Sequence, residues 1–528
     1  MTLRASALAL AALFAAPLAA QTATALDAPD VVGRYQATIT PAELAGHLYV
    51  YADDYMRGRE TGEPGQRFAA RYLAGQYATM GIAPKGTGTS NGNYGLDAYL
   101  QEFALAQSSL TRLEATVRHG DEVVAESVLA PDALDSPVLV PVYGRVEDAG
   151  PGPIVYVGDG TALNGLPVAG AYAVVASGSN QAETRAALGA VRAAGAKAAI
   201  LATAPTTEAL AGQAGGAFRA GRLTLPEIAG AEDEDGGGLP PILFTSQTTL
   251  ASLMTAAGVD ATDGGYPLGD TGLTLDLTAT YSTAEVMTEN VVAFIEGSDP
   301  VLKNEVVVLS AHLDHVGDNG DGEDAIFNGA DDDGSGTISL LEIAEAFQLA
   351  VEAGDGPRRS ILLLHVTGEE KGLLGSEYFA DREPTVPIAS IATNLNIDMI
   401  GRYDPERGFE TTDYVYVIGG DLISQDLHDW NAAVNEATGT GLLLSDRFNS
   451  PDDPNQFFRR SDHWNFGKHE IPFIFYFTGT HEDYHGVGDE ADKIDYDRMA
   501  RIARLIFGTA WEVANRDARP EVSGVGFN

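Results

Sequence analysis

The chain has 528 residues, of which 45% are hydrophobic, so it is long enough for two or three domains with well-filled cores. Its 75 acidic and 32 basic residues give a formal net charge of −43, which argues against nucleic-acid binding because a polyanion would be repelled. The sequence contains no cysteine, and this excludes disulfides, thiolate metal sites and cysteine nucleophiles.

The first 20 residues have the pattern of a secretory signal peptide, with Arg4 supplying a positive charge and residues 7–18 forming an apolar stretch. Cleavage is expected between residues 20 and 25, where small residues follow. The apolar stretch is too short for a typical transmembrane helix, and no other segment has 18 uninterrupted apolar residues. We therefore expect an exported protein, periplasmic or secreted, without stable membrane insertion.

Residues 38–110 begin with a helical pattern, which a Gly-containing loop at residues 58–65 interrupts. A second helix is predicted after this loop and should end at Gly81. Its expected buried face is formed by Phe68, Tyr72, Leu73, Tyr77 and Met80.

The character of the chain changes between residues 112 and 282, where short apolar runs alternate with Gly and Pro. One helical pattern occupies residues 185–194. The region contains no convergent group of His, Asp and Glu. It is predicted to be a small β-rich domain with one or two helices.

From residue 290 the sequence repeats strand, loop and helix. Helices are expected at about residues 335–352 and 495–514. Near-continuous apolar strands that alternate with helices predict an α/β fold whose sheet is covered on both faces. The predicted strands are residues 290–295, 305–310, 361–366, 394–397, 414–418 and 473–477.

Carboxylates and imidazoles follow several of these strands. Glu369 and Glu370 end one strand, and because adjacent residues of an extended chain point in opposite directions, they can take different roles. Open α/β sheets place their sites at such strand ends. Nitrogen and oxygen ligands without sulfur suit a hydrolytic zinc site with an open coordination position. The other candidates are His312, Asp314, Asp332, Asp398, Tyr484 and His485.

The motifs, in this order, resemble those of the M28 metallopeptidases, the di-zinc aminopeptidases and glutamate-carboxypeptidase-like enzymes. The resemblance implies a zinc-exopeptidase fold with a mixed, mostly parallel central sheet flanked by helices, built from residues 30–111 and 283–520. Residues 112–282 resemble the protease-associated domain that many members carry as an insertion. The matching motifs are His312-Leu313-Asp314, the loop from Asn328 to Gly336, Glu369-Glu370, Asn396-Ile397-Asp398-Met399, Ser461-Asp462-His463 and Tyr484-His485.

Carried over residue by residue, the resemblance implies two Zn²⁺ ions. His312 and Asp398 bind the first, Glu370 and His485 bind the second, and Asp332 bridges both. Cobalt or manganese could occupy the same ligands.

The resemblance assigns roles around the metals as well. Asp314 orients His312 through its second ring nitrogen, and a cis peptide is expected between Asp332 and Asp333. Glu369 is the expected general base, and Tyr484 the expected hydrogen-bond donor to the developing oxyanion.

Each residue alone has a structural alternative, such as a turn, a cap or a buried histidine. His315, His463 and His481 are additional imidazoles; His463 is expected to be structural, and His481 is a rival of His485. It is the set of motifs in order that favours a metal site.

The leading hypothesis is an exported di-zinc exopeptidase that acts on peptides, most simply an aminopeptidase. A carboxypeptidase or dipeptidase is the main alternative and needs a basic pocket, for which Arg402, Arg459 and Arg460 are the candidates. A glutaminyl-cyclase-like enzyme and a catalytically dead scaffold used for binding are further alternatives. The motifs determine neither the side-chain preference nor the oligomeric state.

Overall fold

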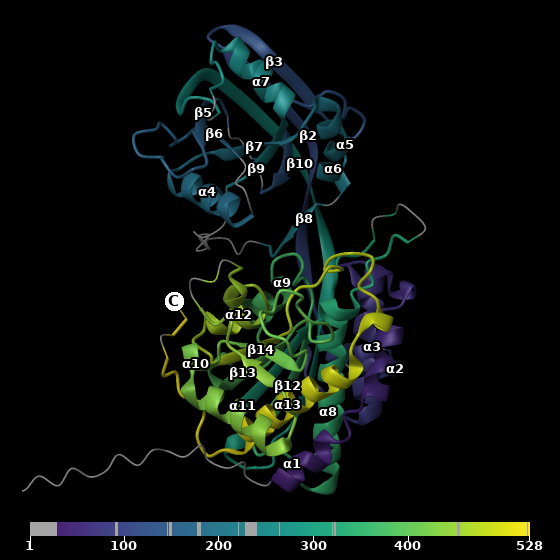
Figure 1. The fold of residues 1–528 in the computed structure, drawn as a ribbon. Helices are drawn as coiled ribbons and strands as arrows, with labels where there is room; N and C mark the ends of the chain where they lie inside the picture. Colours follow the sequence, from purple (N-terminus) through teal and green to yellow (C-terminus); the bar gives the residue numbers. More distant parts are fainter. Residues whose placement is uncertain are drawn as a thin grey trace, which may run out of the picture.

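The computed structural model describes residues 29–89, 93–144, 146, 150–176, 181–219, 221–226, 240–262, 265–318, 320, 324–450, 453, 455–524 and 526–527. The predicted signal peptide lies outside these residues. The chain forms two lobes (Figure 1), and one pair of long strands runs through both. Within the part of the chain described, no helix has the length and apolar character needed to cross a membrane.

The two long strands are β2 (Leu100–His119) and β10 (Gly269–Ile295), which pair antiparallel from Leu100 opposite Val291 to His119 opposite Leu273. Within the upper lobe, β10 alternates between buried leucines and exposed polar residues, as a strand with one covered face does. Within the lower lobe, Val291, Val292 and Ala293 are all buried, so both faces are covered there. The predicted boundaries at residues 111–112 and 282–283 fall inside these two strands.

The lower lobe contains a seven-strand section of sheet in the order β15-β14-β16-β13-β11-β12-β10. Two neighbouring pairs, β14 with β16 and β12 with β10, are antiparallel, and the other pairs are parallel. This confirms the predicted mixed, mostly parallel sheet. The strands are β11 (Val306–His312), β12 (Ser360–Val366), β13 (Ile391–Ile397), β14 (Tyr414–Ile418), β15 (Leu443–Ser445) and β16 (Phe473–Phe477).

Helices cover this sheet, and α8 (Gly336–Ala353) and α13 (Tyr496–Asn515) confirm the two helices predicted for this part of the chain. Ring contacts between the two helices, such as Phe347 with Phe507 at 4.6 Å between centroids, contribute to the largest core cluster. The remaining helices of the lower lobe are α1 (Pro29–Gln36), α2 (Pro41–Tyr51), α3 (Pro64–Met80), α9 (Leu374–Glu377), α10 (Gly420–Ile423), α11 (Gln425–Thr438) and α12 (His463–Gly467).

Helix α3 ends at Gly81, as predicted, and this glycine has a left-handed φ of 76°. The predicted buried face is wrong at Phe68, which is 62% exposed. The helix instead turns its small residues inward, together with Leu73 and Tyr77, because close packing against α8 favours alanines at the contact. Those small residues are Gly65, Ala69, Ala70 and Ala74.

The upper lobe contains four parallel strands in the order β5-β6-β7-β9, with β4 antiparallel at the edge. Its described residues form four helices, so the prediction of one or two helices was wrong. Two of them begin at Thr206 and Ser246, whose hydroxyls accept a backbone N–H three residues later. The helices are α4 (Gln181–Ala193), α5 (Thr207–Ala214), α6 (Gly216–Arg219) and α7 (Gln247–Ala256).

The remaining strands of the chain are short, apart from β3, which pairs with β2. They are β1 (Ala83–Pro84), β3 (Glu122–Leu129), β4 (Val140–Tyr143), β5 (Gly152–Gly158), β6 (Tyr172–Val175), β7 (Ala198–Ala204), β8 (Arg222–Thr224) and β9 (Ile242–Ser246).

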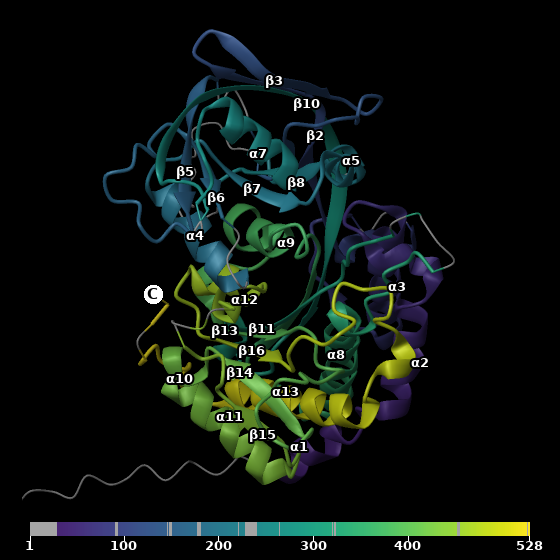
Figure 2. The same cartoon turned by 45° about the horizontal axis from the view of Figure 1, so that its top comes forward.

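Each lobe has its own apolar core, and the two core clusters of the upper lobe draw their residues from positions 110–281. A smaller cluster joins the lobes, in which Leu374 of α9 packs with Leu223 of β8. Phe103 of β2 also stacks on Tyr378, with 4.2 Å between the ring centroids. Figure 2 shows α9 and α12 on the side of the lower lobe that faces the upper lobe.

Candidate metal centre

The predicted site residues meet at one edge of the lower-lobe sheet. His312 is the last residue of β11, while Glu369 and Glu370 follow β12 and Asp398 follows β13. These three strands are parallel neighbours, so their carboxyl ends lie side by side. The loop before α8 adds Asp332, and the loop after β16 adds His485.

Asp332 lies between two groups of side chains. Its Oδ1 is 3.2 Å from His312 Nε2, which is also 3.6 Å from Asp398 Oδ1. Its Oδ2 is 3.1 Å from His485 Nε2, which is also 3.1 Å from Glu370 Oε2. The five residues predicted as metal ligands are therefore brought together, with one carboxylate facing both imidazoles.

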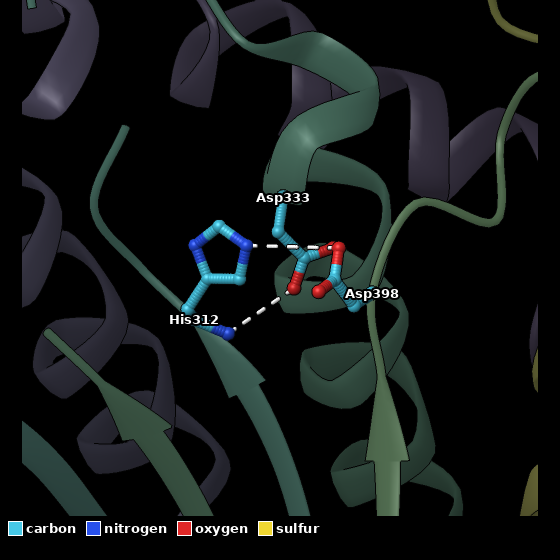
Figure 3. A group of neighbouring side chains, drawn as sticks. All are labelled: His312, Asp333 and Asp398. Carbon is cyan, nitrogen blue, oxygen red and sulfur yellow. Dashed lines mark hydrogen bonds and ion pairs between the residues drawn. The ribbon is translucent and has the colours of Figure 1, made fainter. Parts of the chain in front are cut away.

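Asp333 lies next to the first group but has other partners. Figure 3 shows the imidazole of His312 directed toward Asp398, while Asp333 accepts the backbone N–H of His312 at 3.1 Å. Asp333 also accepts the N–H groups of Gly336 at 2.9 Å and Met399 at 3.2 Å. This carboxylate thus ties three segments of the site together. The Asp332–Asp333 peptide bond is cis, which confirms the expectation from the resemblance.

His315 belongs to the second group, although sequence reasoning assigned it no role. Its Nδ1 is 2.9 Å from Glu370 Oε1 and 3.7 Å from Asp332 Oδ2. His315, Asp332 and Glu370 can offer three ligand atoms within 4.8 Å of one another, as can His312, Asp333 and Asp398. The only sequence signal for His315 was its position three residues after His312.

The other two imidazoles have partners of their own. His481 Nε2 is 3.3 Å from Asp331 Oδ2, so its ring is paired with the residue before the shared carboxylate. His463 Nε2 lies 2.9 Å from the carbonyl oxygen of Phe458, and its ring stacks on Phe475 with 4.6 Å between centroids.

Asp314 connects two parts of the site. His312 Nδ1 is 3.1 Å from the backbone carbonyl of Asp314 and 3.8 Å from its carboxylate, so the nearer partner is the backbone. The carboxylate accepts the Thr61 hydroxyl at 2.7 Å and the Glu369 N–H at 3.2 Å. Asp314 therefore fixes both the ring of His312 and the turn that carries Glu369.

A buried arginine holds the loops of the site. Arg59 donates to the carbonyl oxygens of Leu313 (3.1 Å), Asn328 (2.6 Å) and Gly329 (2.8 Å). It donates to the carbonyl of Tyr51 as well, and its guanidinium lies 4.6 Å from the centre of that ring. Among the described residues, the hydrogen bonds of this cation go to backbone carbonyls, and they join the N-terminal segment to both metal-site loops.

Sequence reasoning missed Asp489 and gave Ser461, a member of one matching motif, no role, because both are recognised only through their hydrogen-bond partners. Asp489 accepts the backbone N–H groups of Asp331 and Asp332 at 3.0 and 3.1 Å. The Ser461 hydroxyl donates to Asp398 Oδ2 at 2.7 Å, which leaves Asp398 Oδ1 toward His312. Both contacts fix the direction of a candidate ligand.

Burial opposes ionisation of the titratable groups of this site, and their different neighbours give them very different proton affinities. Burial, reinforced by the charges of Glu370 and Asp398, raises the pKa of Glu369 well above its usual range. Burial opposes ionisation of Asp332 too, but hydrogen bonds from His312 and His485 hold its pKa well below the usual range. Against the effect of burial, Asp332 and Glu370 raise the pKa of His485 to about 10.

These donors fit zinc. Two imidazoles and three carboxylates without sulfur form a donor set typical of hydrolytic zinc sites. Asp332, Glu370 and Asp398 are gathered in a part of the protein from which water is largely excluded, where their charges require cations. A cation on each side of Asp332 would supply that charge.

A partly open cavity adjoins the site, and its empty space, open solvent included, is about 360 Å³. Tyr484 lines the cavity and stacks on His485 at 3.9 Å between centroids; burial raises the pKa of its hydroxyl, which keeps its proton. The lining residues are Asp332, Glu369, Asp398, Met399, Phe457, Arg460, Phe475, Phe477, Thr480, Tyr484 and His485.

Comparison with known proteins gives a consistent family. Residues 290–510 match the family model described as peptidase family M28. A "Probable zinc metalloprotease" of Pyrenophora teres f. teres is 29% identical over 276 residues, covering 44% of this chain and 53% of that protein. A "probable leucine aminopeptidase 2" of Aspergillus oryzae is 30% identical over 251 residues, covering 46% of this chain and 45% of that protein. The chain thus spans about half the length of these curated relatives.

The fold has a counterpart among solved structures. The aminopeptidase from Aneurinibacillus sp. strain AM-1 aligns with a TM-score of 0.53 and 17% sequence identity. The alignment covers 94% of this chain and 98% of that protein. The similarity therefore includes both lobes.

Proposed function

Because residues 290–510 belong to peptidase family M28, we propose that this protein is an exported zinc exopeptidase that releases residues from the N-terminus of peptides. The observation that carries the proposal is the position of Asp332, whose two oxygens face His312 and His485 separately. One carboxylate between two ligand groups is an arrangement that can hold two metal ions close together, as two-metal hydrolases need.

Two Zn²⁺ ions are proposed as the cofactors. His312 and Asp398 would hold one ion, Glu370 and His485 would hold the other, and Asp332 would contribute to both. Bound zinc lowers the pKa of water and polarises a carbonyl oxygen. Asp314 and Ser461 keep the ligands in position through the contacts described above.

Glu369 is the proposed general base. It lines the cavity beside Asp332, and burial raises the pKa of its carboxyl group. A carboxylate with a raised proton affinity can take a proton from the attacking water and pass it to the leaving amine. The N–H of Glu369 is bonded to Asp314, which fixes the start of this turn.

Tyr484 is the proposed donor to the oxyanion. Burial keeps its hydroxyl protonated, and it lines the same cavity as Glu369. A neutral donor that is already in place stabilises the negative charge that develops on the carbonyl oxygen.

The remaining expectations form part of the same proposal. The N-terminal segment is a signal peptide, so the enzyme is periplasmic or secreted. Residues 112–282 form a protease-associated domain inserted between residues 30–111 and 283–520. A dead scaffold used for binding is disfavoured because all five candidate ligands and Glu369 hold suitable residues.

The test is hydrolysis by the purified protein of aminoacyl p-nitroanilides and unblocked peptides, with N-acetylated copies as controls. Activity is expected to disappear on chelation and to return with zinc, at about two ions bound per chain. N-acetylation is expected to abolish cleavage. A zinc-loaded protein that cleaves none of the unblocked substrates would refute the aminopeptidase.

A further inference from the structure

The structure separates the three arginines that could form a basic pocket near the site. Arg402 is neutralised by Asp483 at 2.6 Å and by Glu482 at 3.1 Å. Arg459 lies with its guanidinium 4.9 Å from the centre of the Trp464 ring and does not line the cavity. Arg460 is the one of the three that lines the cavity beside the candidate metal ligands.

The side chain of Arg460 packs against an aromatic ring. Its guanidinium lies 4.9 Å from the centre of the Phe457 ring, and Phe457 lines the same cavity. Among the described residues, no carboxylate forms an ion pair with Arg460. The residue is exposed, and its charge acts to lower the pKa of Tyr484 against the larger effect of burial, so it lies near the reacting groups.

The rest of the cavity consists of an apolar wall and a group of acids. The wall is formed by Met399, Phe457, Phe475 and Phe477. The acids are Asp332 and Asp398, which are proposed metal ligands, and Glu369. Metal cations would offset the negative charge of these ligands, and no acid among the described residues offsets the charge of Arg460.

We propose that Arg460 makes this cavity selective for a substrate that places a carboxylate in it. The inference rests on the proposed peptidase function and identifies its substrate class. A guanidinium binds a carboxylate through two parallel charge-assisted hydrogen bonds, and the apolar wall accommodates the carbon chain that carries the acid. The carboxylate has two possible sources, namely the side chain of an acidic N-terminal residue and the C-terminal carboxylate of a very short peptide.

Two pairs of substrates distinguish the sources. The p-nitroanilides of glutamate and glutamine differ only in the side-chain carboxylate. A dipeptide and its C-terminal amide differ only in the main-chain carboxylate. Each pair is measured with the zinc-loaded wild type, with Arg460→Gln and Arg460→Lys, and with Arg459→Gln as a matched control on the neighbouring arginine that does not line the cavity.

For one of the two pairs, the wild type is expected to show a kcat/KM for the acidic member that is about tenfold or more above that for the neutral member. A hydrogen bond to a charged group contributes enough free energy for a difference of this size. Arg460→Gln is expected to remove the preference mainly by raising KM for the acidic member of the pair. Arg460→Lys should keep part of the preference for the acidic substrate, because lysine retains the charge but not the planar guanidinium that binds both carboxylate oxygens. Arg459→Gln should keep the whole preference.

The two failures are distinguishable. Equal rates for both members of each pair, or a preference that survives in Arg460→Gln, would overturn the role of Arg460 while the peptidase function stands. Absence of zinc-dependent hydrolysis of every substrate would refute the proposed function, and this inference with it. Zinc content and circular dichroism of each variant show that a lost preference does not result from misfolding.

Discussion

The two lobes share one sheet, yet among the described residues only the lower lobe carries a candidate metal centre. In the lower lobe, β11, β12 and β13 are buried along their whole length and end in histidine and carboxylates. In the upper lobe, β6 is equally buried and parallel to its neighbours, but it ends at Val175 and is followed by Ala176. Among the described residues, the candidate metal groups all lie in the lower lobe. Buried parallel strands position the residues that follow them, and the identity of those residues determines whether a site can form.

The two lobes also differ in the interactions that hold their segments in place. The metal-site loops are fixed by buried charged groups, since Arg59 binds carbonyls while Asp333 and Asp489 bind amides. The upper lobe depends on two apolar clusters on either side of its strands. We therefore expect substitutions in the lower lobe to change activity or zinc binding, and substitutions in the upper lobe to change stability alone.

The largest effect is expected from Glu369→Gln, which removes the proposed base and keeps the shape of the side chain. We expect kcat to fall by about 10²–10⁴-fold, because that is the typical contribution of a positioned general base. Zinc content should remain at the wild-type level, since Glu369 is not among the five proposed ligands. Steady-state kinetics and metal analysis test this, and a loss of less than about tenfold would exclude Glu369 as the base.

The next-largest effect is a loss of stability when the buried cation Arg59 is replaced. Arg59→Met removes the donor to several buried carbonyl oxygens, so we expect the free energy of unfolding to fall by about 3–5 kcal/mol and zinc affinity to fall with it. Arg57→Met is the control, because Arg57 forms an ion pair with Asp318 at the surface and its side chain is 62% exposed. Its cost should be below about 1 kcal/mol. Urea unfolding of both variants measures the difference, and equal losses would contradict the role of Arg59.

The fold and the set of candidate ligands could be predicted from sequence to a large extent. The buried strands β11 and β12 are continuous apolar runs, which have few alternatives in this context. Helices in the upper lobe were missed because α5 and α7 are rich in Ala and Thr and have little apolar periodicity. Their N-cap residues, Thr206 and Ser246, were the available signals.

Residues that act through contacts distant in sequence were not predictable in the same way. Asp489 became meaningful only when its carboxylate was found on the amides of Asp331 and Asp332, 157–158 positions away. Arg59 is separated by 269 positions from its partner Asn328. A single sequence contains no signal for such pairs, whereas histidine and carboxylates at strand ends carry their chemistry in their own identity.

Substitutions that create a cavity in either core should lower stability, but only the substitution in the lower lobe should also weaken zinc binding. Leu275→Ala in the upper-lobe core should cost about 2–5 kcal/mol of stability, as should Leu363→Ala in the lower-lobe core, since both side chains are fully buried. Only Leu363→Ala should weaken zinc binding, because β12 leads into Glu369 and Glu370. Thermal unfolding combined with zinc titration tests the pair. Equal weakening of zinc binding by both would show that the lobes respond as one unit.

The smallest effect tests whether the lower lobe tolerates a buried acid outside the metal centre. Burial raises the pKa of Glu342 on α8 from its usual 4.5 to about 8, with the charges of Glu345 and Glu43 acting in the same direction. One of its oxygens has no hydrogen-bond partner, although His47 Nε2 lies 3.4 Å away. Between these two pKa values the folded state holds the proton that the unfolded state has lost. The stabilisation linked to this group is therefore complete below about pH 4.5 and is lost as the pH rises through about 8.

Glu342→Gln removes this titration, so the variant should gain stability relative to the wild type as the pH increases. We expect a relative gain on the order of 1–3 kcal/mol between about pH 5 and pH 9. Urea unfolding at several pH values measures it, with Glu352→Gln as the control because Glu352 is an exposed residue of the same helix. A difference between Glu342→Gln and the wild type that does not change with pH would mean that Glu342 ionises normally in the folded protein. The buried acids of the lower lobe would then need no cation to remain charged, which would weaken the argument that links the carboxylate cluster to metal.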